Sequence, residues 1–312
     1  MKRIALVLPW VGKRPKYWTP WLRSAEGRCF DVIAVEKTLD EFSRLVQERL
    51  ADPSDPNAAP LRLRSGYKLC DLKPMYGILF AEALERYDYW AFGDCDVLYG
   101  RGLDAWIERA IAADCDVASV QGEYCAGPFT LVRNCERCNH LFEKAAGWRE
   151  MLLRPQMMTF DELGPNWFRR QAYGGADFGD LRAAADSFSA VCWREAAAGR
   201  LRLVHETVIC ETALGSAASG GGRVSLEPDG RLLADGREVA LYHFIDGKNR
   251  PGFSCDETGV WIAGGWPFVR DLLAFAGRLL RGRRRDWCRV SECVQRKLGL
   301  KGWQREFPWN NR

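Results

Sequence analysis

The chain has 312 residues, of which 47% are hydrophobic and 28% are charged, and its formal net charge is +4. This length and composition fit one large α/β domain or two small ones with a sizeable core. No stretch reaches the roughly 20 apolar residues of a membrane-spanning helix, and Met1 to Trp10 begins like a strand rather than a secretion signal, so we expect a cytoplasmic protein with free thiols at its twelve cysteines.

The first third of the sequence predicts the strand–helix–strand beginning of an α/β domain. The apolar runs Ile4 to Leu8 and Phe30 to Val35 are typical of buried parallel strands. Leu39 to Leu50 has the spacing of a helix. Pro74 to Tyr87 predicts a further helix with one buried face, which leads into an aromatic strand, Tyr89 to Phe92.

The pattern changes from residue 221 onward to short alternating runs separated by turn signals. Pro228-Asp229-Gly230 and Asp235-Gly236 are strong turn sequences, so Arg223 to Phe244 predicts a meander of three strands. The small residues of Ser216 to Gly222 predict a flexible connection before it.

Two acidic residues, Asp94 and Asp96, directly follow the aromatic strand. This position, just past the carboxyl end of a strand, is where open α/β sheets bind their ligands. Two carboxylates one residue apart can both reach one Mn²⁺ or Mg²⁺ ion, while substrate phosphates fill its other positions. Asp-x-Asp also occurs often by chance, as a solvated turn. The apolar segments on both sides of the pair favour the metal site.

The run Lys68-Leu69-Cys70-Asp71-Leu72-Lys73-Pro74, followed by Trp90 to Asp96, resembles the core of GT-A glycosyltransferases, especially a poorly characterised group of bacterial surface-polysaccharide transferases. The resemblance covers residues 1 to 250 in outline. It implies a single Rossmann-like GT-A domain with a mostly parallel central sheet. It also implies a metal-dependent transferase that moves a sugar from a nucleotide-diphosphate donor to a glycan or lipid-linked acceptor in polysaccharide synthesis. Asp71 and Lys73 would contact the ribose and diphosphate.

A second segment, Tyr242 to Lys248, resembles the late His and Gly-x-Lys element of the glycogenin-like family. In that family the His is a further metal ligand and the Lys contacts the diphosphate, which assigns these roles to His243 and Lys248. A neutral imidazole suits Mn²⁺, and an ammonium pairs with phosphate. Asn249-Arg250-Pro251 follows where that family has Pro-Trp, and a structural His is the alternative interpretation.

Asp161 and Glu162 are the candidate catalytic residues, because an inverting transferase needs a carboxylate that takes the proton of the acceptor hydroxyl. An exposed acidic pair at a helix start is the alternative, and Asp177 and Asp180 are the reserve candidates. The predicted site residues are Asp94, Asp96 and His243 for the metal, Asp161 and Glu162 for catalysis, and Trp10, Gly12, Asp71, Lys73 and Lys248 for the nucleotide and its diphosphate.

The positive charge is concentrated at the C-terminus, where residues 270 to 312 hold twelve Lys or Arg against four Asp or Glu. We expect a GT-A domain over residues 1–266, with a nucleotide-binding half at 1–120 and an acceptor half at 121–266, and a basic helical tail at 267–312. Apolar and aromatic residues among the cations suit a helix that lies in the interface of an anionic membrane. The protein would then be peripheral at the inner face of that membrane. A solvated basic helix is the alternative. Nucleic acid is not an expected partner, because no binding module accompanies the charge.

Two other functions stay open. The segment from Asp94 to Tyr99 resembles the nucleophile loop of haloacid-dehalogenase phosphatases, although that family normally carries the motif on its first strand. A non-catalytic GT-A shell that binds a nucleotide or glycan without turnover is the second alternative.

Overall fold

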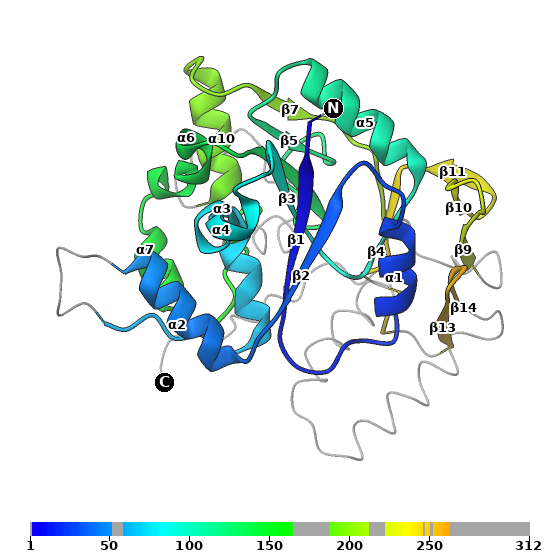
Figure 1. Cartoon of the computed structure of the whole chain (residues 1–312), viewed down its shortest axis with the longest axis horizontal. Helices are drawn as coiled ribbons and strands as arrows, with labels where there is room; N and C mark the ends of the chain where they lie inside the picture. Colours follow the sequence, from blue (N-terminus) through cyan, green and yellow to red (C-terminus); the bar gives the residue numbers. More distant parts are fainter. Residues whose placement is uncertain are drawn as a thin grey trace, which may run out of the picture.

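The computed structural model describes residues 2–51, 59–164, 187–211, 222–245, 247–249 and 252–262 of the chain. Figure 1 shows a mixed α/β fold in which a six-stranded sheet lies between two layers of helices, with a smaller sheet at one side. The predicted α/β class is therefore confirmed. None of the helices in the described ranges has the length and hydrophobicity that crossing a bilayer requires. The predicted tail and the boundary at residue 266 lie outside those ranges.

The six-stranded sheet has the order β2-β1-β3-β6-β5-β7. Its strands are β1 (Ile4–Trp10), β2 (Asp31–Glu36), β3 (Tyr89–Gly93), β5 (Val117–Ser119), β6 (Phe129–Arg133) and β7 (Leu203–His205). β1 is parallel to both β2 and β3, as the strand–helix–strand pattern predicted, and β5 is parallel to β7. β6 is antiparallel to both of its neighbours, so the sheet is more mixed than the predicted one.

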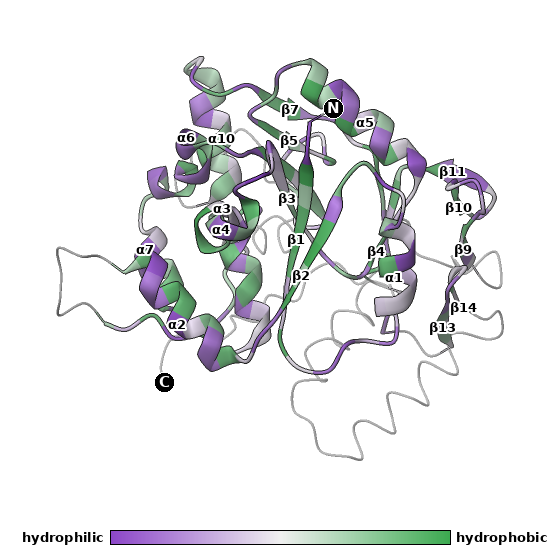
Figure 2. Cartoon of the chain, viewed as in Figure 1, coloured by the Kyte–Doolittle hydropathy of each residue, from purple (hydrophilic) through white to green (hydrophobic). Residues whose placement is uncertain are grey.

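Helices cover both faces of this sheet. One layer contains α2 (Leu39–Leu50), α3 (Tyr76–Leu79), α6 (Glu136–Asn139), η2 (Leu141–Lys144), α7 (Trp148–Leu153) and α10 (Phe188–Ala197), and the other contains α1 (Trp18–Ala25) and α5 (Arg101–Ala112). Along β1, Ala5 and Val7 point into the first core, whereas Leu6 and Leu8 point into the second. Figure 2 shows a mostly hydrophobic β1 beside helices that carry both hydrophilic and hydrophobic residues.

The helix predicted over Pro74 to Tyr87 is interrupted. The chain forms a 3₁₀ helix, η1 (Gly66–Met75), and then two short helices, α3 and α4 (Ala81–Leu84). Between them Phe80 leaves helical geometry, with φ −120° and ψ 28°, and buries its ring against Tyr76 at a centroid distance of 5.4 Å. The apolar spacing is that of a helix, but the backbone at Phe80 divides the predicted helix into two short ones.

The predicted meander is confirmed in β9 (Gly222–Leu226), β10 (Leu232–Ala234) and β11 (Arg237–Val239), which pair antiparallel. β13 (Phe253–Asp256) and β14 (Gly259–Ile262) extend it to the five-stranded sheet β11-β10-β9-β14-β13. Asp235 and Gly236 both have positive φ, at 48° and 80°, so they form the two-residue hairpin turn that the sequence predicted.

A third sheet joins the segment that follows the meander to the segment that follows β3. β4 (Val97–Tyr99) pairs antiparallel with β12 (Leu241–His243), which pairs in parallel with β8 (Ile209–Cys210). In this register His243 lies opposite Val97. The pairing brings the late His segment beside the turn between β3 and β4.

Candidate metal centre

Asp94 and Asp96 lie in the turn that connects β3 to β4. All five residues of β3 are buried, and the strand ends at Gly93, where a Cβ atom would lie 3.0 Å from the carbonyl oxygen of Pro128. The carboxyl end of β3 therefore brings the two aspartates to the sheet edge that the sequence predicted. Asp96 is buried, whereas the side chain of Asp94 is partly exposed.

His243 completes a group of three possible ligands. One side-chain ligand atom from each of Asp94, Asp96 and His243 lies within 4.8 Å of the other two. His243 is buried, and its Nε2 is 3.5 Å from Oδ2 of Asp96. Two hard carboxylate oxygens and one imidazole nitrogen suit Mn²⁺, and also other divalent ions that accept oxygen and nitrogen. This donor set therefore fits a divalent cation.

Glu211, which the sequence analysis missed, holds the other nitrogen of this imidazole. Its Oε1 lies 2.6 Å from Nδ1 of His243. A proton on Nδ1, donated to Glu211, leaves Nε2 as the nitrogen that faces the two aspartates. Glu211 directly follows β8, and only the pairing of β8 with β12 brings it near His243. No local sequence signal could have identified it.

The group is strongly coupled electrostatically. Burial raises the pKa of Asp96, but the hydrogen bonds and charges of His243 and Lys248 outweigh this effect and hold that pKa well below its usual value. Burial lowers the pKa of His243, but hydrogen bonds with Asp96 and Glu211 outweigh it and raise this pKa to about 10. The raised pKa favours the doubly protonated imidazolium when no cation is bound, and a bound cation would displace the proton on Nε2.

Both aspartates also pair with lysines that the sequence analysis assigned to the diphosphate. Nζ of Lys73 lies 2.8 Å from Oδ1 of Asp94, and Nζ of Lys248 lies 2.5 Å from Oδ2 of Asp96. The structure thus brings Lys73 and Lys248 to the edge of the group.

The predicted catalytic pair lies beside Lys73. Oδ2 of Asp161 is 3.1 Å from Nζ of Lys73, and Oε1 of Glu162 accepts a hydrogen bond from the backbone amide of Gly127 at 2.8 Å. Burial raises the pKa of Asp161 to about 8, and the charge of Lys73 opposes this effect only in part. Asp161 is buried and Glu162 is partly exposed, so Glu162 is the more accessible of the two carboxylates. The reserve candidates Asp177 and Asp180 lie outside the described residues.

The structure corrects the role of Asp71. This residue is fully buried, and its carboxylate pairs with Lys68 at 2.9 Å and accepts hydrogen bonds from the backbone amides of Met158 and Phe160. These contacts hold the segment that carries Asp161 in place. A carboxylate with these partners cannot also reach a ribose or diphosphate, so Asp71 is a structural residue.

Trp10 and Gly12 lie at the same sheet edge as the metal group, because β1 is parallel to β3. The indole nitrogen of Trp10 donates to the carbonyl oxygen of Gly12 at 3.1 Å, and Gly12 has a positive φ of 85°. This bond occupies the carbonyl oxygen of Gly12, and within the described residues no hydrogen bond or ion pair joins Trp10 or Gly12 to the aspartates.

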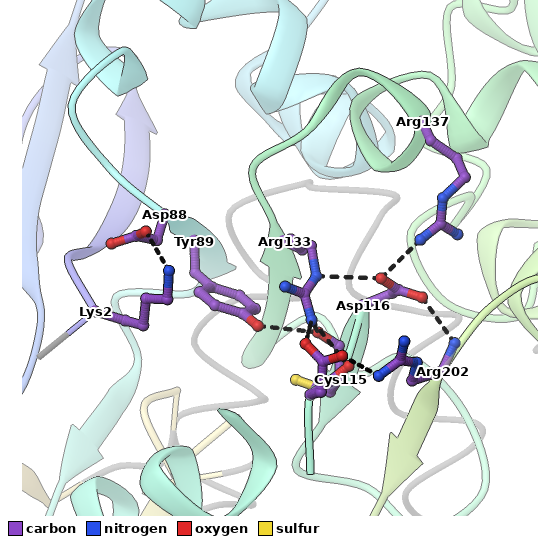
Figure 3. A network of polar contacts seen from close by, with 9 residues as sticks. Lys2, Asp88, Tyr89, Cys115, Asp116, Arg133, Arg137 and Arg202 are labelled. Atoms are coloured by element: carbon purple, nitrogen blue, oxygen red, sulfur yellow. Dashed lines mark hydrogen bonds and ion pairs between the residues drawn. The ribbon is translucent and has the colours of Figure 1, made fainter. Parts of the chain in front are cut away.

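A second polar network lies at the opposite end of β3 (Figure 3). Asp116 accepts hydrogen bonds from Arg133, Arg137 and the backbone amide of Arg202, at 3.2, 2.7 and 2.9 Å. These residues come from the ends of β5, β6 and β7 and from α6, so the network ties neighbouring elements together. Because one buried carboxylate joins three strand ends and a helix, we assign this network a structural role.

Comparison with known proteins gives a family but no activity. The search of curated proteins returns no match. Among solved structures, the crystal structure of A197 from STIV is similar, with 14% identity, a TM-score of 0.30, and coverage of 77% of this chain and 97% of that chain. A likeness this distant carries no argument about function. A family model described as "Family of unknown function (DUF6625)" matches residues 27–206, which include Lys73, Asp94, Asp96 and Asp161. Because this match covers more than half of the chain, the protein belongs to the DUF6625 family.

Proposed function

We propose that this protein is a divalent-metal-dependent glycosyltransferase of the GT-A type. It would transfer a sugar from a nucleotide-diphosphate donor to a glycan or lipid-linked acceptor. The observation that carries the proposal is the convergence of Asp94, Asp96 and His243 at the carboxyl end of β3. Nucleotide ligands of open α/β sheets bind at this edge.

The chemistry of the group suits the departure of a nucleoside diphosphate. Cleavage of the bond between sugar and phosphate leaves negative charge on the diphosphate, and a cation held by Asp94, Asp96 and His243 would stabilise that charge. Lys248, at the border of the group, adds an ammonium that pairs with phosphate oxygens. Trp10 and Gly12 lie in the neighbouring loop at the same edge of the sheet, where they would contact the nucleotide.

The acceptor hydroxyl would lose its proton to Glu162. This carboxylate is partly exposed and is oriented by the backbone amide of Gly127, so it can reach a substrate oxygen. Asp161 is buried against Lys73, so it acts as a positioning residue that keeps the lysine beside Asp94.

The test is a screen of nucleotide sugars, with different bases and sugars, in the presence of Mn²⁺ or Mg²⁺ and of glycan acceptors. We expect release of the nucleoside diphosphate with at least one donor, dependent on metal and acceptor, and at least about 100-fold slower in Asp96→Asn, which loses an anionic ligand. Asp40→Asn is the matched control, because Asp40 is exposed on α2.

Two outcomes would contradict the proposal. Release of inorganic phosphate from phosphomonoesters, lost in Asp94→Asn, would indicate the phosphatase alternative. A metal-dependent rise in melting temperature with a nucleotide sugar would show that the donor binds. If no acceptor in the panel then gave turnover, the protein would be a binding protein.

A further inference from the structure

The ammonium of Lys248 contacts the same carboxylate that a bound cation would use. Oδ2 of Asp96 is 2.5 Å from Nζ of Lys248 and 3.5 Å from Nε2 of His243. The side chain of Lys248 is 21% exposed, and Asp96 is its hydrogen-bond partner within the part of the chain that the structure describes. Lys248 thus has one strong contact and access to solvent.

Lys73, the other lysine of the group, is held differently. Its Nζ contacts Asp94, Asp161 and the carbonyl oxygen of Gly127 at 2.8, 3.1 and 3.1 Å, and its side chain is 4% exposed. A cation that binds Asp94 leaves Lys73 with two other partners. A cation that binds Oδ2 of Asp96 weakens the pair between Lys248 and Asp96, because the two positive charges repel each other at that oxygen and Lys248 has no second carboxylate partner within the described residues.

We propose that Lys248 is an exchangeable counter-ion, which pairs with Asp96 until a divalent cation displaces it and then pairs with the diphosphate of the ligand. This inference rests on the metal site and anionic ligand of the proposed function, but does not require sugar transfer. Cation and diphosphate then bind cooperatively, since each favours the position of Lys248 that the other needs. Lys248 weakens binding of the cation alone and strengthens binding of the diphosphate.

The test compares wild type, Lys248→Met and Lys144→Met in direct binding measurements. Lys144 is the matched control, because its ammonium pairs with Glu195 away from the metal group. Free Mn²⁺ is measured by electron paramagnetic resonance during titration of each protein. Lys248→Met should bind Mn²⁺ at least about threefold more tightly than wild type and Lys144→Met, as expected when a competing ion pair is removed.

Pyrophosphate, a diphosphate without a base, then probes the second half of the exchange by calorimetry with and without saturating Mn²⁺. Wild type should gain at least about threefold more pyrophosphate affinity from Mn²⁺ than Lys248→Met does. Chelation of Mn²⁺ by free pyrophosphate is the same for all proteins, so it cancels in this comparison.

The direction in which Lys248→Met changes the Mn²⁺ affinity decides whether the proposed exchange holds. Equal or weaker Mn²⁺ binding by Lys248→Met, repeated in Lys248→Gln with an unchanged melting temperature, would overturn the exchange. Tighter Mn²⁺ binding by Lys248→Met, together with a smaller gain in its pyrophosphate affinity from Mn²⁺, would support the exchange. Because this result does not depend on sugar transfer, it separates this inference from the proposed function.

Discussion

The backbone amide of Phe244 donates a hydrogen bond to the carbonyl oxygen of Asp96, at 3.0 Å. This bond continues the antiparallel pairing of β12 with β4 beyond the pair of His243 and Val97. The turn that carries the aspartates and the strand that carries the imidazole are therefore one hydrogen-bonded unit. Main-chain pairing, rather than flexible side chains, sets the positions of the candidate ligands, which is the pre-organisation that a metal site needs.

We predict that Glu211→Ala weakens Mn²⁺ binding about tenfold, because Nδ1 of His243 loses the carboxylate that orients the ring and makes it more basic. Glu211→Gln, which keeps a hydrogen-bond acceptor, should lose less. The melting temperature in EDTA should fall only in part, because Asp96 remains beside the imidazole of His243. Titration of Mn²⁺ with Glu206→Gln as control checks this, because Glu206 pairs with Arg109 on the surface. Equal Mn²⁺ affinities in Glu211→Ala and the control would rule out the positioning role.

The imidazole also predicts a dependence of stability on pH. The pKa of His243 is raised from 6.5 to about 10, so the folded protein holds this proton more tightly than the unfolded chain. The stabilisation is complete below about pH 6.5 and is lost as the pH rises towards 10. In EDTA, the melting temperature of wild type should fall more steeply over this range than that of His243→Gln. Parallel curves for the two proteins would refute the assignment.

The strands and the metal turn could be predicted from the sequence because their signals are local. β1, α2 and the position of Asp94 after β3 follow from apolar runs, helical spacing and the aromatic strand. His243 came from a resemblance, and the β4–β12 pairing that places it beside Asp96 has no local signal.

Other parts of the site were not predictable because they depend on tertiary packing. The break at Phe80 has no signal in the apolar spacing, and Glu211 reaches His243 only through the β8–β12 pairing. Asp71 was predicted to contact the ribose and diphosphate because the resemblance to GT-A glycosyltransferases gives this role to a residue that precedes the metal motif. Its actual partners, Lys68 and the amide of Met158, could be identified only from the folded chain.

The corrected role of Asp71 leads to a prediction about stability. Asp71→Ala should cost about 3–5 kcal/mol of unfolding free energy, because it leaves the buried ammonium of Lys68 without a counter-charge. Adding Lys68→Met should recover part of this loss. Urea unfolding measures both effects. A variant of unchanged stability that binds nucleotides more weakly would instead restore the ligand-contact interpretation.

A side chain at Gly127 is predicted to displace the charged ends of Lys73 and Asp161. A Cβ atom there would lie 2.8 Å from Nζ of Lys73 and 3.0 Å from Oδ2 of Asp161. Gly127→Ala should destabilise the protein by about 1–3 kcal/mol and slow nucleoside diphosphate release by roughly 10- to 100-fold, because it shifts the charged groups of the site. Gly66→Ala is the control, since its Cβ would meet Val11 at an ordinary 3.6 Å. If both variants release nucleoside diphosphate at the wild-type rate, the close packing around Gly127 has no functional role.

The most direct measurement is anomalous diffraction at the manganese edge from crystals grown with Mn²⁺ and pyrophosphate. The account predicts one strong peak bound by Asp94, Asp96 and Nε2 of His243, with Nζ of Lys248 moved from Asp96 to a phosphate oxygen. A peak away from these three residues, or no peak in crystals where pyrophosphate is bound, would contradict the metal centre on which the proposed glycosyltransferase depends.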